Sequence, residues 1–145
     1  MRVMPACRLT AIGAARDELI TWRRYGECLA AVEAALRQAS DAEPTAEAAE
    51  ELGAGWVAEE ALATALFCAL KAQDFVHGIR LAVNHSGDSD STAAITGNIL
   101  GALWGRLAIP EEFLETLELR SVIEELSLDL SGWGAEEDYR KYPPW

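Results

Sequence analysis

The residues best suited to chemistry lie in one short stretch, from Asn84 to Thr92. It places two aspartates, Asp88 and Asp90, one residue apart and follows them with the hydroxyl side chains of Ser91 and Thr92. Carboxylate and hydroxyl oxygens are hard ligands, which suit Mg²⁺, Mn²⁺ or Ca²⁺ better than zinc. Two carboxylates this close repel each other unless a cation lies between them. The spacing therefore predicts a divalent-metal site at the start of a helix.

Three other interpretations of the same stretch make different demands on spacing. A helix cap needs only one carboxylate, and Asp or Ser before an apolar helix is common. An EF-hand loop starting at Asp88 needs glycine and glutamate at later positions, where this sequence has Ala93 and Ile99. A phosphatase motif of the haloacid dehalogenase type fits Asp88, Asp90 and Thr92. Its first aspartate ends a buried strand, however, and the segment before Asp88 has a helical pattern.

Other polar residues near this stretch have simpler explanations. His85 could act as a general base, but a hydrogen-bonded structural histidine is the more common case. Glu59 and Glu60 fit the first turn of a helix, where the helix dipole favours acidic residues. The acidic run from Glu47 to Glu51 is best explained as a solvated helix face.

The elements that must position these residues have helical patterns of hydrophobic residues. The clearest helix is predicted over residues 57–72, and the helix after the acidic pair over 91–104. In the latter, Gly97, Gly101 and Gly105 recur every four residues and predict close packing against a neighbour, since glycine otherwise destabilises a helix by about 1 kcal/mol.

Further helices are predicted over residues 15–25, 27–39, 46–52, 75–84, 110–116 and 119–130, after an irregular entry over 1–14. Thr45 and Asp74 are predicted N-caps. Val122, Ile123, Leu126 and Leu130 are predicted to face inward on the last helix. No segment alternates as a strand does, so the predicted fold class is all-α. Residues 1–145 are predicted to form a single domain with a loosely ordered tail over 131–145.

The composition excludes several classes of function. The chain has 12 Lys and Arg against 24 Asp and Glu, a net charge of −12. Such a chain is a poor partner for nucleic acid or for anionic membranes. Three cysteines without a CxxC pair predict neither a zinc knuckle nor a disulfide framework, and a reduced cytoplasm fits best. No signal peptide and no membrane span is expected.

Two segments together resemble the ADP-ribosylglycohydrolase family. They run from Gly53 to Leu62 and from Leu81 to Ala102, and the second contains Gly-Asp-x-Asp-Ser followed by a glycine-spaced helix. The resemblance covers residues 26–130. It implies an all-α hydrolase that cleaves the glycosidic bond between ADP-ribose and a protein side chain or small molecule, with a binuclear Mg²⁺ or Mn²⁺ site.

Residue by residue, the resemblance implies catalytic roles for Asp88 and Asp90. It implies that these two and Ser91 are metal ligands, and it places Trp56 near the ribose cleft. Family members also carry a Thr-Asp-Asp motif nearer the N-terminus, and this chain has no Asp-Asp pair.

The missing motif predicts a domain truncated on its N-terminal side. A second chain or self-association would then supply the missing half. The alternative is a non-enzymatic binding module that keeps a remnant of the fold.

Overall fold

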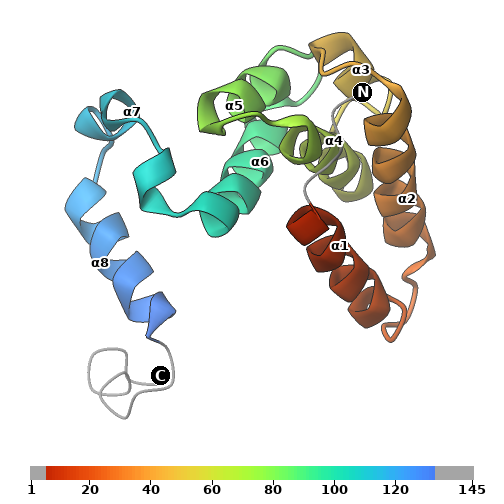
Figure 1. The fold of residues 1–145 in the computed structure, drawn as a ribbon, viewed down its shortest axis with the longest axis horizontal. Coiled ribbons are helices and arrows are strands. Elements are labelled where there is room, and N and C mark those ends of the chain that lie inside the picture. The colour runs from red at the N-terminus through yellow and green to blue at the C-terminus, as the bar shows by residue number, and fades with distance from the viewer. Residues whose placement is uncertain (1–5, 133–145) are drawn as a thin grey trace. The chain divides into compact units, whose positions relative to one another are not determined.

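The structure is a computed structural model that describes residues 6–132, and all regular secondary structure in that range is helical (Figure 1). The described chain forms two compact units, one ending at Ile109 and one beginning at Pro110. The predicted all-α class is confirmed. The single domain over 1–145 stays a prediction, and the predicted tail from residue 133 onward lies outside the described residues.

Over its described residues, 6–109, the first unit holds six α-helices and a short 3-10 helix. They are α1 (Ala6–Leu19), α2 (Gly26–Asp41), α3 (Ala46–Glu50), α4 (Ala58–Lys71), α5 (Phe75–Val83), α6 (Ser89–Trp104) and η1 (Arg106–Ala108). Helix α4 is the centre of this unit, because it packs against α2 as well as against α5 and α6 (Figure 1). Its small side chains allow this close approach, and its larger residues Phe67 and Cys68 are fully buried.

Most predicted helices are confirmed, with ends shifted by a few residues. Thr45 caps α3 by accepting the N–H of Ala48 at 3.1 Å, and Asp74 caps α5 by accepting the N–H of His77 at 2.8 Å. The important shift is at α6, which begins at Ser89 rather than at residue 91. Asp90 therefore lies in the first turn of the helix, together with Ser91, and not before it.

The prediction for the first 25 residues was wrong in part: residues 15–19 are helical as predicted, but residues 6–14 are helical too and residues 20–25 are not. A helix, α1, covers Ala6–Leu19, and the chain turns between residues 20 and 25. Arg8 joins this helix to the end of α4. Its Nη1 donates to the carbonyls of Ala69 and Leu70, each at 2.9 Å. The guanidinium also lies 4.9 Å from the ring centroid of Trp104. These carbonyls have no partner within the helix, so a cation there is favourable.

The glycine pattern of α6 does not mark a close helix contact along its length. A Cβ at Gly101 would meet nothing within 4 Å, and Gly105 lies past the end of the helix with a φ of 73°. The tight contact is instead at Gly78 in α5, where a Cβ would overlap the side chain of Leu100 and lie 2.9 Å from Ala72. The close packing exists, but the glycine that permits it belongs to the neighbouring helix.

Gly101→Ala is therefore expected to stabilise the protein. Alanine in a helix interior is favoured over glycine by about 1 kcal/mol, and the added methyl group meets no neighbour. Urea unfolding followed by circular dichroism should show a higher midpoint with an unchanged slope. A loss of stability would mean that Gly101 packs against a surface that this structure does not show.

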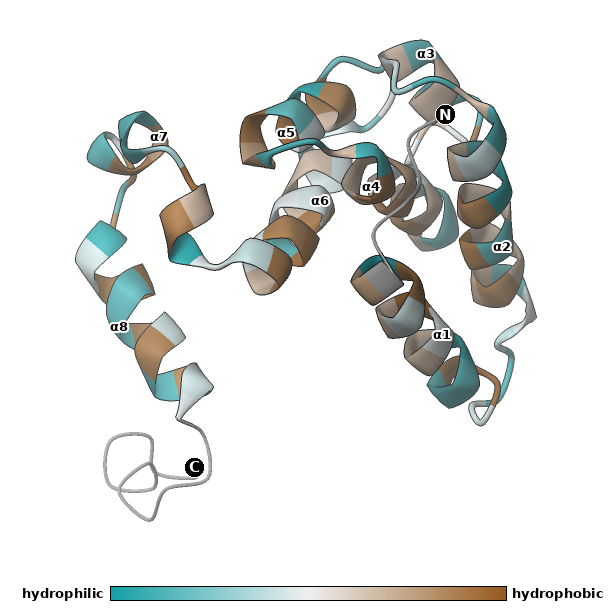
Figure 2. Ribbon diagram, viewed as in Figure 1, coloured by the Kyte–Doolittle hydropathy of each residue, from teal (hydrophilic) through white to brown (hydrophobic). Residues whose placement is uncertain are grey.

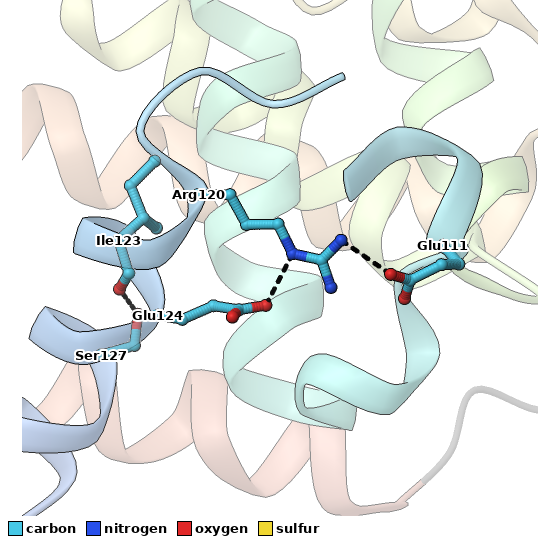
Figure 3. Close-up of polar contacts among 5 residues, drawn as sticks. All are labelled: Glu111, Arg120, Ile123, Glu124 and Ser127. Atoms are coloured by element: carbon cyan, nitrogen blue, oxygen red, sulfur yellow. Dashed lines mark hydrogen bonds and ion pairs between the residues drawn. The ribbon is translucent and has the colours of Figure 1, made fainter. Parts of the chain in front are cut away.

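The second unit contains α7 (Glu111–Glu115) and α8 (Arg120–Ser131). Arg120 links them, since its guanidinium contacts Glu111 at 2.7 Å and Glu124 at 3.0 Å (Figure 3). These carboxylates raise the pKa of Arg120, with Glu111 as the larger cause. Helix α8 carries hydrophobic and hydrophilic residues (Figure 2). The prediction that Val122, Ile123, Leu126 and Leu130 face inward was wrong, because all four are exposed and α8 buries no residue.

Among residues 6–132, no helix is long and apolar enough to cross a membrane.

The burial of Cys68 gives a chemical test of the core. Loss of solvation raises the pKa of its thiol to about 12, whereas Cys7 is exposed. Since the thiolate is the reactive form, iodoacetamide at pH 8 should label Cys7 and leave Cys68 unmodified until urea is added. Peptide mapping by mass spectrometry measures both sites. Equal labelling rates in the folded protein would contradict the packing of α4.

Candidate metal-binding site

The candidate site lies where two loops meet at the start of α6. One loop, residues 51–57, connects α3 to α4, and the other, residues 84–88, connects α5 to α6. The N–H of Asp88 donates to the carbonyl of Ala54 at 2.7 Å. Gly87 lies so close to Ala54 that a Cβ there would overlap its carbonyl oxygen and lie 2.6 Å from its carbonyl carbon. The two segments that carry the family resemblance are thus in direct backbone contact.

The first loop depends on glycine and on one glutamate. Gly55 has a φ of 81°, and a Cβ added to it would lie 3.5 Å from the Cβ of Asp88. Only glycine adopts such a φ without strain. Glu60 accepts the N–H of Gly55 at 3.1 Å. Glu60 is in the first turn of α4, as predicted, but it also holds this loop in place.

Asp88 and Asp90 are brought together as the sequence predicts. Asp88 occupies the N-cap position of α6, yet its side chain makes no capping hydrogen bond. The pKa of Asp90 is lowered, first by the side-chain hydrogen bond between Asp90 and Asp88 and then by the backbone N–H groups of Ser91 and Asp90. The two carboxyl groups are therefore neighbours at the start of α6. Helix capping therefore does not account for the Asp88 side chain, whose carboxyl group instead faces that of Asp90.

Ser91 and Thr92 have different environments. Ser91 is partly exposed in the first turn, next to Asp90. Thr92 is fully buried, and its Oγ1 lies 2.6 Å from Nε2 of His85. Ser91 can serve as a ligand beside the two carboxylates, whereas the hydroxyl of Thr92 is engaged inside the protein.

His85 is a structural histidine, as the more common interpretation has it. It is only 5% exposed. Its Nδ1 accepts the N–H of Gly87 at 3.1 Å, and its Nε2 contacts the hydroxyl of Thr92. Both ring nitrogens are occupied, so no lone pair is free to take a proton from water. The other histidine, His77, accepts the N–H of Gln73 at 3.2 Å through its own Nδ1.

Glu50 is a site residue that the sequence did not reveal. It belongs to the acidic run that was explained as a solvated face, but its carboxylate accepts the hydroxyl and the N–H of Ser86, the latter at 3.4 Å. These bonds lower the pKa of Glu50, with the Ser86 hydroxyl as the largest cause. The partners are far apart in sequence, so only the fold could show that α3 supports the loop before Asp88.

The described residues offer only part of a metal site. Between residues 6 and 132, no group of three or more His, Cys, Asp or Glu side chains is placed to hold a metal ion. What is present is two adjacent carboxylates and a hydroxyl, the hard-oxygen donors that Mg²⁺ and Mn²⁺ take. Mg²⁺ has six ligands and usually keeps several waters. These residues therefore fit one face of a coordination sphere.

A separate apolar pocket lies between α1, α4 and α6. Its volume is about 360 Å³, and Arg8, Leu66, Leu70 and Leu103 are among the residues that line it. None of the candidate ligands lines this pocket.

Comparison with known proteins gives one family. The family model described as ADP-ribosylglycohydrolase matches residues 5–139, which extends beyond residues 26–130 at both ends. The ADP-ribosylarginine hydrolase Tri1 of Serratia proteamaculans is 36% identical over 80 residues, 55% of this chain and 22% of that protein. An uncharacterized protein of Archaeoglobus fulgidus is 40% identical over 83 residues, 57% of this chain and 27% of its own.

A third relative, the ADP-ribosylhydrolase ARH1 of Dictyostelium discoideum, is 43% identical over 53 residues, 37% of this chain and 14% of that protein. The matching segments thus span at most 27% of the length of these relatives. No solved structure gives a significant match.

Proposed function

Because the chain belongs to the ADP-ribosylglycohydrolase family, we propose that it supplies the Asp88–Asp90 part of a metal-dependent hydrolase site. The reaction would cleave the glycosidic bond that joins ADP-ribose to a protein side chain or a small molecule. One of these relatives, Tri1 of Serratia proteamaculans, is named an ADP-ribosylarginine hydrolase, so ADP-ribosylated arginine is the first substrate to test.

One observation carries this proposal. The carboxyl groups of Asp88 and Asp90 lie together at the start of α6, and Asp88 does not use its side chain as a cap. Two adjacent carboxylates are unfavourable unless they share a proton or a cation. A pair kept together at a helix start, on a loop held by two other segments, is suited to exchange a shared proton for a bound Mg²⁺ or Mn²⁺.

The residues of the candidate site would have the following roles. Asp88, Asp90 and the hydroxyl of Ser91 would hold the metal. A bound Mg²⁺ or Mn²⁺ would supply an activated water and orient the ribose hydroxyl groups. Glu50 and Glu60 act at a distance, since they hold the two loops. Trp56 is 73% exposed and adjoins Gly55, where it could contact the ribose.

The limited number of ligands bears on whether this chain acts alone. Two carboxylates are fewer than a binuclear site needs, and the part of the chain that the structure describes offers no third. We therefore propose that the remaining acidic ligands come from another polypeptide or from a second copy of this chain. The alternative is a binding module without turnover, which the same shortage of ligands favours.

The test is release of ADP-ribose from an arginine-ADP-ribosylated protein in Mn²⁺ or Mg²⁺, with EDTA as the reference. This chain is assayed alone and then mixed with an N-terminal segment of the Serratia relative. We expect little release from the chain alone and metal-dependent release from the mixture. The same mixture made with the Asp88→Ala chain should give none.

The outcomes separate the two functions. Release by the chain alone would overturn the need for a second polypeptide. No release under any condition, together with no Mn²⁺ binding by calorimetry, would overturn the hydrolase proposal. Binding of Mn²⁺ without release by any mixture would favour the binding module.

A further inference from the structure

The loop that carries Asp88 is fixed by a buried pair of side chains, His85 and Thr92. We propose that these two residues form a positioning pair that sets the direction of the Asp88 carboxylate, an inference that rests on the proposed metal site. Neither residue would touch the metal or the substrate. Their effect would pass through the backbone on both sides of Asp88.

The hydrogen-bond network assigns the tautomer of His85. Its Nδ1 accepts the N–H of Gly87 at 3.1 Å, so this nitrogen carries no proton. The proton of the neutral ring is therefore on Nε2, which donates to Oγ1 of Thr92 at 2.6 Å. With 5% exposure for His85 and none for Thr92, water does not compete for these bonds.

The hydroxyl of Thr92 extends the network to both helices. It lies 3.2 Å from the carbonyl of Ala82 in α5, 3.1 Å from the carbonyl of Asp88 and 3.2 Å from that of Ser89. Having accepted from His85, the hydroxyl has its own hydrogen to donate to one of these carbonyls. The ring and the hydroxyl thereby connect the end of α5, the loop and the first turn of α6.

These hydrogen bonds hold the two peptide groups that flank Asp88. On one side, the Gly87 N–H donates to His85 and the Asp88 N–H donates to Ala54. On the other, the Asp88 carbonyl accepts the N–H of Thr92 at 3.2 Å and lies near its hydroxyl. The backbone before and after Asp88 is thus held, while its carboxylate has no capping bond. This arrangement fixes the direction of the side chain through the backbone alone.

Substitutions can separate the two bonds of the ring. His85→Asn keeps an acceptor near the position of Nδ1 and loses the bond to Thr92. His85→Gln keeps a donor near the position of Nε2 and loses the bond to Gly87. His85→Phe keeps the ring and loses both. Thr92→Val removes the hydroxyl at nearly constant shape, and Thr92→Ser restores it. His77→Asn is the matched control, because His77 also accepts a backbone N–H through Nδ1.

The experiment measures Mn²⁺ affinity by calorimetry and the His85 tautomer by long-range ¹H–¹⁵N NMR of the wild-type chain. We expect the proton on Nε2. We expect His85→Phe and Thr92→Val to weaken Mn²⁺ binding roughly tenfold or more, the range found when groups that orient metal ligands are removed. The double variant should lose no more than either single one, because the two residues act as one unit. Thr92→Ser and His77→Asn should bind as the wild type does.

Several results would overturn the inference. One is a proton on Nδ1, and another is unchanged Mn²⁺ affinity in a folded His85→Phe or Thr92→Val chain. If His85→Phe does not fold, His85→Asn and His85→Gln decide instead, and wild-type affinity in both would count against the pair. A wild-type chain that binds no Mn²⁺ would overturn the metal site itself. Binding that is equally strong in all variants would overturn only the role of His85 and Thr92.

Discussion

Gly87→Ala is expected to lower the free energy of unfolding by about 3 kcal/mol, the upper part of the range for overpacking a tight contact. The added Cβ would overlap the carbonyl oxygen of Ala54 and lie 2.6 Å from its carbonyl carbon. The obstacle is backbone, so no side chain can turn aside to make room. The two loops would have to separate, and the bond from the Asp88 N–H to Ala54 would be lost. Urea unfolding followed by circular dichroism gives the change.

The same variant tests the link between the loop contact and the metal site. Separating the loops moves the peptide groups beside Asp88, so Mn²⁺ affinity should fall together with stability. Gly101→Ala is the matched control, because it adds the same methyl group where nothing lies within 4 Å. Wild-type stability in Gly87→Ala would contradict the approach of the two loops.

Asp88→Ala and Asp90→Ala are expected to remove measurable Mn²⁺ and Mg²⁺ binding. Losing a residue that merely orients a ligand weakens metal affinity about 10- to 100-fold, so losing a ligand itself should cost at least about as much. Stability without metal should change little in Asp88→Ala, since its side chain makes no capping bond. Isothermal calorimetry and urea unfolding of the same samples measure both quantities.

Asp74→Ala provides the opposite pattern as a control. Asp74 accepts the N–H of His77 at 2.8 Å, and losing an N-cap costs about 1 kcal/mol. This variant should be less stable and should bind metal as the wild type does. If Asp88→Ala instead loses the stability of a cap and keeps its metal binding, the helix-cap interpretation of the Asp88 stretch is the correct one.

The polar residues show which parts of the candidate site can be predicted from local spacing in the sequence. Spacing and the family resemblance predicted Asp88, Asp90 and Ser91 as metal ligands, because ligands for one ion can lie within a single turn of chain, and that role stays a prediction. Glu50 was missed, since the loop it holds is 36 residues away. Only the packing of α3 near α5 brings it to Ser86. The glycine pattern in α6 misled for a related reason, since the spacing of glycines does not say which helix of a pair needs the missing side chain.

Helix ends could also be predicted from local sequence, whereas solvent exposure could not. Thr45 and Asp74 were identified as caps from sequence, because a cap acts on backbone three residues away. The inward face predicted for α8 was wrong, because a hydrophobic stripe shows only that burial would be favourable. The structure must supply a neighbour, and the second unit does not bury these side chains. For α1, the tie between Arg8 and the end of α4 joins residues that no local pattern relates.

The sequence by itself determined that this protein is helical, that its clearest helical pattern lies over residues 57–72, and that a pair of carboxylates stands at the start of a helix. These features depend on residues within a few turns of one another, so their periodicity and spacing are visible in the chain. The tertiary structure decided that the loop of Ala54 and Gly55 supports Asp88, that His85 and Thr92 are buried together, and that Glu50 holds Ser86. Those contacts arise when α3, α4, α5 and α6 pack, and no local spacing in the sequence marks the residues that they join.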